Sequence, residues 1–201
     1  MNTILWKPSK SQVNSSQIEA FRLQVNSRFN LNIETYSELH SWSITNISDF
    51  WKAIWGFMAI ECSSNYKQIV DDVNKMPGAK WFEGTRFNFA ENLLRLRSNK
   101  PAIHFQNENK TKKTISYNKL YNEVEKLASS LRKIGVKKGD RIVGYMPNIP
   151  ETIIGMLATT SIGAIWSSCS PDFGTQGVLD RFTQIKPKII FATDGYFYNG
   201  K

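Results

Sequence analysis

The sequence is poor in the residue types that build disulfide frameworks and metal centres. Only two cysteines, Cys62 and Cys169, and two histidines, His40 and His104, occur among its 201 residues. Neither cysteine has another Cys or a His at metal-ligand spacing, which argues against a zinc site as well as against a disulfide framework. We therefore predict no metal centre, and a reducing, cytoplasmic location.

Long hydrophobic runs are also missing. The most apolar stretch, residues 50–60, contains Lys52 and is shorter than the roughly 20 residues that span a bilayer. Residues 1–8 lack a basic stretch followed by an apolar one. The sequence thus predicts neither an export signal nor a membrane span.

Recognisable catalytic motifs are absent as well. Ser167 and Ser170 stand near Cys169, yet there is no nucleophile elbow and no paired base, so a hydrolase is not predicted. The pair Gly200-Lys201 lacks the preceding glycine and the helix that a phosphate loop requires. We predict no catalytic residue within this chain.

The composition does supply a core and a basic surface. Hydrophobic residues make up 41% and aromatic residues 12%, which is ample for a packed interior, and the net charge is +9. The densest basic patch, Arg132, Lys133, Lys137 and Lys138, falls at the end of a predicted helix, where cations favour the helix dipole. A solvated face is the preferred interpretation and nucleic-acid binding is not predicted; a stand-alone module for an anionic partner is the alternative.

The first hundred residues are predicted to be helical and irregular. Ser48 can cap a helix whose apolar residues follow spacings of three and four, which indicates a packing stripe. Residues 76–84 carry Pro and Gly and predict a loop, and a short helix is expected at 90–96. The residues of the stripe are Phe50, Trp51, Ile54, Trp55 and Met58.

From about residue 100 the pattern changes to strands and helices. Residues 102–105 and 114–117 predict a β-hairpin, and Ser116 precedes an amphipathic helix that Gly135 closes. The apolar stripe of this helix is predicted from spacings of three and four and consists of Leu120, Val124, Leu127, Leu131 and Ile134. Strands at 141–146, 164–168 and 188–192 then alternate with helices at 151–162 and 176–185. Because strands joined by crossover helices run parallel, this half predicts a βαβαβ unit.

The fold class follows from these elements. We predict an α/β protein with a helical or irregular N-terminal segment, a β-hairpin, and an incomplete doubly wound parallel βαβαβ sheet. The domain boundary is expected at residue 100, with residues 1–100 and 101–201 on its two sides. A natural three-stranded domain with covered edges is the alternative to a truncated sheet.

Specific strings along the whole chain resemble the acetoacetyl-CoA synthetases, a branch of the adenylate-forming acyl-CoA ligases. Acetyl-CoA and propionyl-CoA synthetases share the layout and are the nearest alternative, but they usually carry a Gly-rich turn at residues 170–174. The strings, in chain order, are Trp81-Phe82-Glu83-Gly84, Phe89-Ala90-Glu91-Asn92-Leu93-Leu94, Gly139-Asp140-Arg141, Tyr145-Met146-Pro147-Asn148, Ser161-Ile162-Gly163-Ala164-Ile165-Trp166 and Ser170-Pro171-Asp172-Phe173-Gly174.

The resemblance implies a two-step reaction on ATP, acetoacetate and coenzyme A. The carboxylate attacks the α-phosphate to form an acyl-adenylate, the thiol of coenzyme A then displaces AMP, and Mg²⁺ neutralises polyphosphate charge. The family's phosphate loop, aromatic-Thr-Glu motif, ribose-binding Asp and mobile Lys have no counterparts here. The chain is therefore expected to be an N-terminal part of such a ligase and to be inactive alone.

The resemblance also implies contacts with coenzyme A at two places. The first is the turn at Pro171 and Asp172, and the second is the segment after the last predicted strand, with Tyr198, Gly200 and Lys201. Lys201 offers a cation for a phosphate and Gly200 allows close approach of the backbone. Related acetyl-CoA synthetases have an Arg where this chain has Tyr198.

Overall fold

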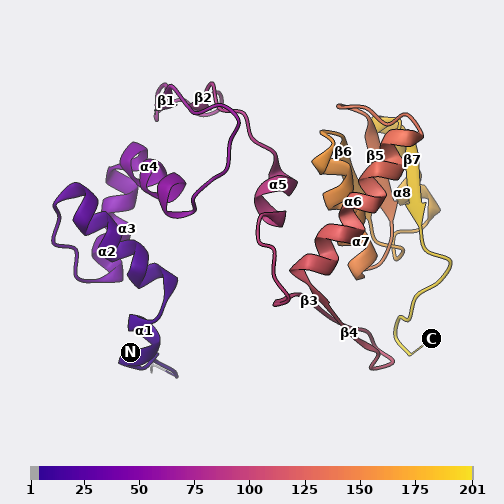
Figure 1. Cartoon of the computed structure of the whole chain (residues 1–201), viewed down its shortest axis with the longest axis horizontal. Helices are drawn as coiled ribbons and strands as arrows, with labels where there is room; N and C mark the ends of the chain where they lie inside the picture. The colour runs from indigo at the N-terminus through magenta and orange to yellow at the C-terminus, as the bar shows by residue number, and fades with distance from the viewer. Residues whose placement is uncertain (1–4, 201) are drawn as a thin grey trace. The chain divides into compact units, whose positions relative to one another are not determined.

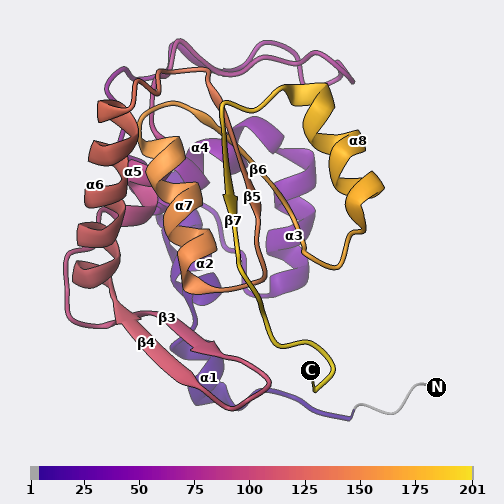
Figure 2. The same cartoon turned by 90° about the vertical axis from the view of Figure 1, so that its right-hand side faces the viewer.

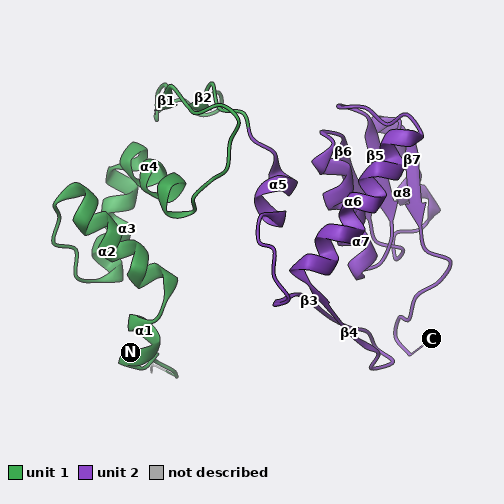
Figure 3. Cartoon of the chain, viewed as in Figure 1, with its two compact units in different colours: residues 1–86 green, residues 87–201 purple. Residues whose placement is uncertain are grey.

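The computed structural model describes residues 5–200 and divides the chain into two compact units. Unit 1 covers residues 1–86 and unit 2 covers residues 87–201 (Figure 3). In the sequence, the division between the units thus falls inside the segment 1–100 that we predicted as the N-terminal domain. The boundary at residue 100 was predicted for the domains of the resembling family, which these compact units do not test, and it stays a prediction.

Unit 1 is built from helices and a short antiparallel strand pair (Figure 1). Ser9, Ser16 and Thr35 accept backbone N–H bonds at the starts of the first three helices, as N-cap residues do. Its helices are α1 (Lys10–Asn14), α2 (Gln17–Phe29), α3 (Tyr36–Thr45) and α4 (Ile47–Phe57). Its buried core consists of Phe21, Val25, Ile33, Leu39 and Ala53.

The predicted packing helix exists, but two details of the prediction are wrong. α4 begins at Ile47 with Asn46 as its N-cap, so Ser48 lies within the first turn instead of capping it. Ala53 is the buried residue of α4, whereas Trp51 is 41% exposed and Met58 is 47% exposed. Spacing alone ranked the large residues as core, while the small Ala53 allows the close approach of helices.

A second antiparallel pair was not predicted. β1 (Gln68–Val70) pairs with β2 (Trp81–Glu83), which lies inside the stretch that we predicted as a loop. Each strand has only three residues, too few for an alternating pattern to stand out in the sequence. Trp55 stacks on Phe82 with ring centroids 4.6 Å apart, so an aromatic contact helps to hold the pair against α4.

Unit 2 is an α/β unit around a three-stranded parallel sheet (Figures 1 and 2). The strand order is β6-β5-β7, with both pairs parallel, which confirms the predicted βαβαβ unit. A separate antiparallel hairpin, β3 with β4, confirms the second predicted feature. The elements are α5 (Phe89–Leu94), β3 (Pro101–Gln106), β4 (Lys112–Ser116), α6 (Tyr117–Lys133), β5 (Arg141–Tyr145), α7 (Pro150–Ser161), β6 (Ile165–Cys169), α8 (Thr175–Ile185) and β7 (Ile189–Ala192).

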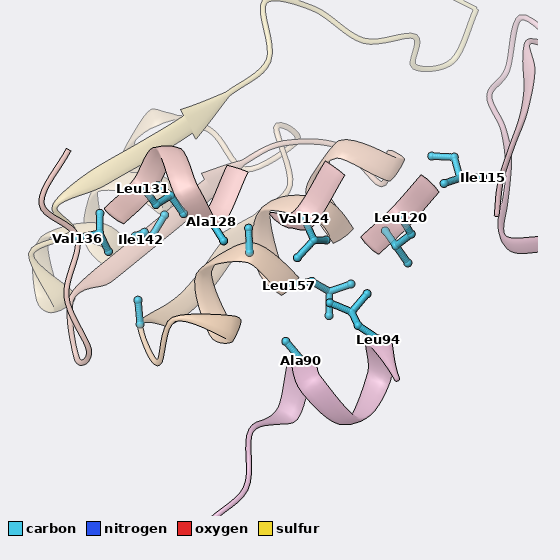
Figure 4. Close-up of a cluster of buried hydrophobic side chains, with 12 residues drawn as sticks. Ala90, Leu94, Ile115, Leu120, Val124, Ala128, Leu131, Val136, Ile142 and Leu157 are labelled. Atoms are coloured by element: carbon cyan, nitrogen blue, oxygen red, sulfur yellow. The ribbon is translucent and has the colours of Figure 1, made fainter. Parts of the chain in front are cut away.

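The two faces of the sheet are covered by different helices. Ile142 of β5 belongs to the main core with α6 and α7, whereas Val143, the next residue, packs against Phe182 of α8. Because alternate residues of a strand point to opposite faces, α7 and α8 lie on opposite sides of the sheet. Figure 4 shows the larger core, where Leu131, Val136 and Ile142 gather between α6 and the sheet.

Helix α6 has the predicted cap and stripe. Ser116 accepts the N–H of Lys119, and Gly135, with φ of 84°, follows the helix end. Leu120, Val124 and Leu131 are buried as expected, together with Ala128. Ile134, the last residue of the predicted stripe, is 65% exposed, so the buried stripe ends at Leu131. No helix within residues 5–200 is long and apolar enough to cross a membrane.

Candidate functional site

The parallel strands of unit 2 bring three chain segments to one edge of the sheet. Helix α7 connects β5 to β6 on one side of it, and helix α8 connects β6 to β7 on the other side of β5. The connections that leave β5 and β6 therefore run in opposite directions across the sheet, with the two helices on opposite faces, and the switch point lies between β5 and β7. Sheets of this kind bind ligands outside the carboxyl ends of the strands at such a switch point.

A cavity of about 800 Å³ lies at this edge of unit 2. Its walls come from the segments that follow β5, β6 and β7 and from the turn between β3 and β4. Of the described residues that line it, three carry carboxylates and none carries a cation. The lining residues from strand ends are Pro147, Asn148, Ile149, Ser170, Asp172, Asp194, Gly195, Tyr196, Phe197 and Tyr198, and those from the hairpin are Phe105, Gln106, Asn107 and Glu108.

The turn after β6 is held in place from below by β5. The Tyr145 hydroxyl lies 3.0 Å from the carbonyl oxygen of Pro171 and 3.3 Å from that of Phe173, and it donates to this pair. The hydroxyl of Ser170 donates to Oδ2 of Asp172 at 2.7 Å. These bonds orient the Asp172 carboxylate, which leaves its second oxygen for a partner on another segment.

That partner is Tyr196, from the segment after β7. Its hydroxyl donates to Oδ1 of Asp172 at 2.6 Å. The Tyr196 bond, followed by the Ser170 bond, lowers the pKa of Asp172 below its usual value because both stabilise the carboxylate. The same bond raises the pKa of Tyr196 to about 12, since ionisation would lose the donor beside a negative charge.

Removing the Asp172 charge is expected to lower the pKa of Tyr196. In Asp172→Asn the pKa of Tyr196 falls from about 12 toward the ordinary phenol value of about 10. In the unchanged chain the raised pKa contributes stability that is complete below about pH 10 and is lost as the pH rises to about 12, because the unfolded phenol ionises first. NMR of ring-labelled tyrosine during a pH titration measures both values.

Asp194→Asn is the matched control for this titration. It removes one carboxylate from the same cavity, whereas the raised Tyr196 pKa has other causes: the Asp172 bond first, then desolvation of the phenol, and then the charges of Asp172, Tyr145 and Tyr198. The Tyr196 pKa should therefore stay near 12 in Asp194→Asn. An equal fall in both variants would contradict the role of the direct hydrogen bond.

The hairpin contributes one further contact from far away in the sequence. Oε1 of Glu108 accepts the backbone N–H of Asn199 at 3.0 Å, and Oε2 accepts that of Gly200 at 3.0 Å. Asn199 and Gly200 both have positive φ, 51° and 76°, a conformation that a glycine adopts without strain. The carboxylate thus ties the hairpin turn to the last described residues.

The predicted coenzyme A contacts can now be placed. Asp172 and Tyr198 line the cavity, and Pro171 lies in the turn that carries Asp172. Gly200 is anchored to Glu108, itself a lining residue, so two segments that are separate in sequence adjoin one cavity. Lys201 lies outside the described residues.

Sequence reasoning missed two residues of this edge. Tyr196 follows a predicted strand, so the rule that ligands bind at carboxyl ends was a signal that could have found it. Glu108 sits in a polar hairpin turn that reads as an ordinary connection, and the sequence carries no signal for its distant partners.

Within residues 5–200 no group of three or more His, Cys, Asp or Glu side chains is placed to hold a metal ion.

Two families match the chain. Residues 89–199 match the family described as AMP-binding enzyme, and residues 36–93 match the family described as acetyl-coenzyme A synthetase N-terminus. The first match covers the hairpin, the parallel sheet and every described residue that lines the cavity.

Individual proteins are similar to this chain over nearly its entire length. An acetoacetyl-CoA synthetase of Macaca fascicularis is 44% identical over 201 residues, and one of Rhizobium meliloti is 44% identical over 197 residues. Each alignment covers 98% of this chain and 30% of the relative. The solved structure of acetoacetyl-CoA synthetase from Streptomyces lividans superposes with a TM-score of 0.92 at 37% identity, covering 100% of this chain and 31% of that one. The chain thus spans about a third of the length of the relatives that it matches.

Proposed function

The chain belongs to the family of AMP-binding enzymes, and from this membership we propose that it is part of a ligase joining acetoacetate to coenzyme A. The family implies the use of ATP. Acetoacetate is the acid that the names of the Macaca, Rhizobium and Streptomyces relatives indicate. The cavity at the carboxyl ends of β5, β6 and β7 is the observation that carries the proposal for this chain, because it unites the turn at Asp172 with the segment at Tyr198.

The proposed reaction has two steps. A carboxylate oxygen of acetoacetate attacks the α-phosphorus of ATP, which forms an acyl-adenylate and releases diphosphate. The thiol sulfur of coenzyme A then attacks the acyl carbon, which forms the thioester and releases AMP. Mg²⁺ would offset the polyphosphate charge in the first step. We assign its site to none of the residues described here.

We assign this chain a role in holding coenzyme A. The nucleotide end of that molecule carries phosphate groups, which bind to backbone N–H groups and cations. The paired N–H groups of Asn199 and Gly200 offer such donors, and Lys201 would add the cation. Pro171 and Asp172 would form the opposite wall, held by Tyr145 and Tyr196.

A chimera tests the proposal. The chain of 201 residues alone should show no acetoacetate-dependent exchange between ATP and pyrophosphate, because the phosphate loop and the catalytic Lys of the family are not in its sequence. The Rhizobium relative with its matched segment replaced by this chain should catalyse the exchange and form the thioester. Gly200→Ala in this chimera should raise the KM for coenzyme A about tenfold and leave the KM for ATP unchanged, because a Cβ hinders phosphate approach to the backbone.

Gly135→Ala is the control for backbone strain. Gly135 has a similar φ, 84°, but follows α6 and precedes the amino end of β5, away from the edge that carries the cavity. Its substitution should leave the KM for coenzyme A unchanged. A folded chimera without exchange activity, or equal effects of the two glycine substitutions, would contradict the proposal.

A further inference from the structure

The turn between β3 and β4 reaches the segment after β7 through a single side chain. Glu108 and its two partners, Asn199 and Gly200, are 91 and 92 residues apart in sequence. In both views of the chain the hairpin tip lies beside the last described residues (Figures 1 and 2). All three residues are exposed, so solvent and solutes have access to the contact.

The contact has the chemistry of anion binding. Two backbone N–H groups of successive residues point at one carboxylate, each 3.0 Å from a different oxygen. Successive N–H groups in such turns form concave sites for anions, and a carboxylate and a phosphate present similar pairs of oxygen acceptors. The Glu108 carboxylate therefore stands where two oxygens of a phosphate group would stand.

We propose that Glu108 is the resident occupant of an anion site formed by the N–H groups of Asn199 and Gly200, and that a phosphate ester must displace it to bind there. Glu108 then lowers the affinity of the site for phosphate groups, because its carboxylate competes with them for the same two N–H groups. The identity of that ester as coenzyme A rests on the proposed function. The displacement itself rests on the geometry of the turn.

The surroundings allow the side chain to leave without disrupting the hairpin. The turn has its own bonds, from the N–H of Thr111 to Oδ1 of Asn107 at 2.9 Å and from the N–H of Lys110 to the carbonyl of Asn107 at 3.0 Å. Lys113 separately joins β4 to Glu151 of α7 at 2.7 Å. Departure of Glu108 also moves one negative charge away from a cavity that retains Asp172 and Asp194.

A tether would behave in the opposite way. If Glu108 served only to hold Asn199 and Gly200 in a binding conformation, its removal would loosen the segment and weaken phosphate binding. If it occupies the site, its removal frees two N–H groups and strengthens binding. The sign of the change in affinity thus separates the two roles.

The experiment is an NMR titration of the 201-residue chain and of Glu108→Ala. The amide signals of Asn199 and Gly200 are followed during addition of inorganic phosphate and, separately, of coenzyme A. Glu108→Ala should bind both about tenfold more tightly than the unchanged chain, because no internal carboxylate competes. The matched control, Glu125→Ala, removes the same charge from an exposed position on α6 and should change neither affinity.

The outcomes separate this inference from the proposed function. Tighter phosphate binding by Glu108→Ala with no binding of coenzyme A supports the displaced occupant and contradicts the coenzyme A assignment. Measurable coenzyme A binding together with phosphate binding that is equal or weaker in Glu108→Ala overturns the inference and leaves the proposed function standing. Equal tightening in the Glu125→Ala control would show a general effect of charge and would also overturn it.

Discussion

Gly144→Ala is expected to lower the free energy of unfolding of unit 2 by about 3 kcal/mol. A Cβ added to Gly144 would lie 2.7 Å from Cζ2 and 2.8 Å from Cη2 of Trp166, well inside contact distance. Gly144 lies on β5, the central strand of the sheet, and Trp166 lies on the neighbouring strand β6, so neither backbone can shift without disturbing the pairing. Native-state hydrogen exchange of the β5 amides measures the loss.

Two further glycine substitutions calibrate this result. At Gly155 in α7 a Cβ would lie 3.1 Å from Cη2 of Trp166, and the gain in helix propensity from Ala, about 1 kcal/mol, opposes the crowding. Gly155→Ala should therefore stay within about 1 kcal/mol of the unchanged chain. At Gly195 a Cβ would meet open space among the described atoms, so Gly195→Ala should also stay within about 1 kcal/mol.

Trp166→Phe provides the decisive test of the cause. Phenylalanine lacks the ring atoms that the new Cβ would strike, so the double variant Gly144→Ala, Trp166→Phe should lose less stability than the two single variants added together. Strict additivity would show that the indole ring is not what requires glycine at this position.

Leu131→Ala is expected to cost about 3 kcal/mol of unfolding free energy in unit 2. Leu131 is 2% exposed and lies in the core that joins α6 to the sheet (Figure 4). Truncation removes buried methyl groups and leaves a cavity, while alanine keeps the helix propensity of α6 high. The same hydrogen-exchange measurement, read at the α6 and β5 amides, reports the cost.

Leu179→Ala is the matched control for the core truncation. The substitution makes the same chemical change on α8, but Leu179 is 50% exposed, so loss of its side chain should cost less than about 1 kcal/mol of unfolding free energy. If both leucines cost the same, burial in the α6 core would not be the source of the stability.

The candidate site was predictable only in part. The resemblance named Pro171, Asp172 and the segment at Tyr198 and Gly200, and the parallel strands explain why these segments adjoin the same cavity. The Tyr196 to Asp172 bond joins side chains 24 residues apart, and Glu108 reaches partners 91 residues away. Such pairings depend on where elements pack, which no local pattern of residues encodes.

The sequence by itself determined the alternation of strands and helices in unit 2, because periods of two and of three to four residues are local properties of the chain. It also determined the capped stripe of α6, from Ser116 to Leu131. The tertiary structure decided that Ala53 and not Trp51 is buried in α4, that β1 pairs with β2, and that Glu108 meets Asn199 and Gly200. The reason is physical: burial and pairing over long separations are set by the sum of many packing contacts, whereas periodicity and caps act within a few residues.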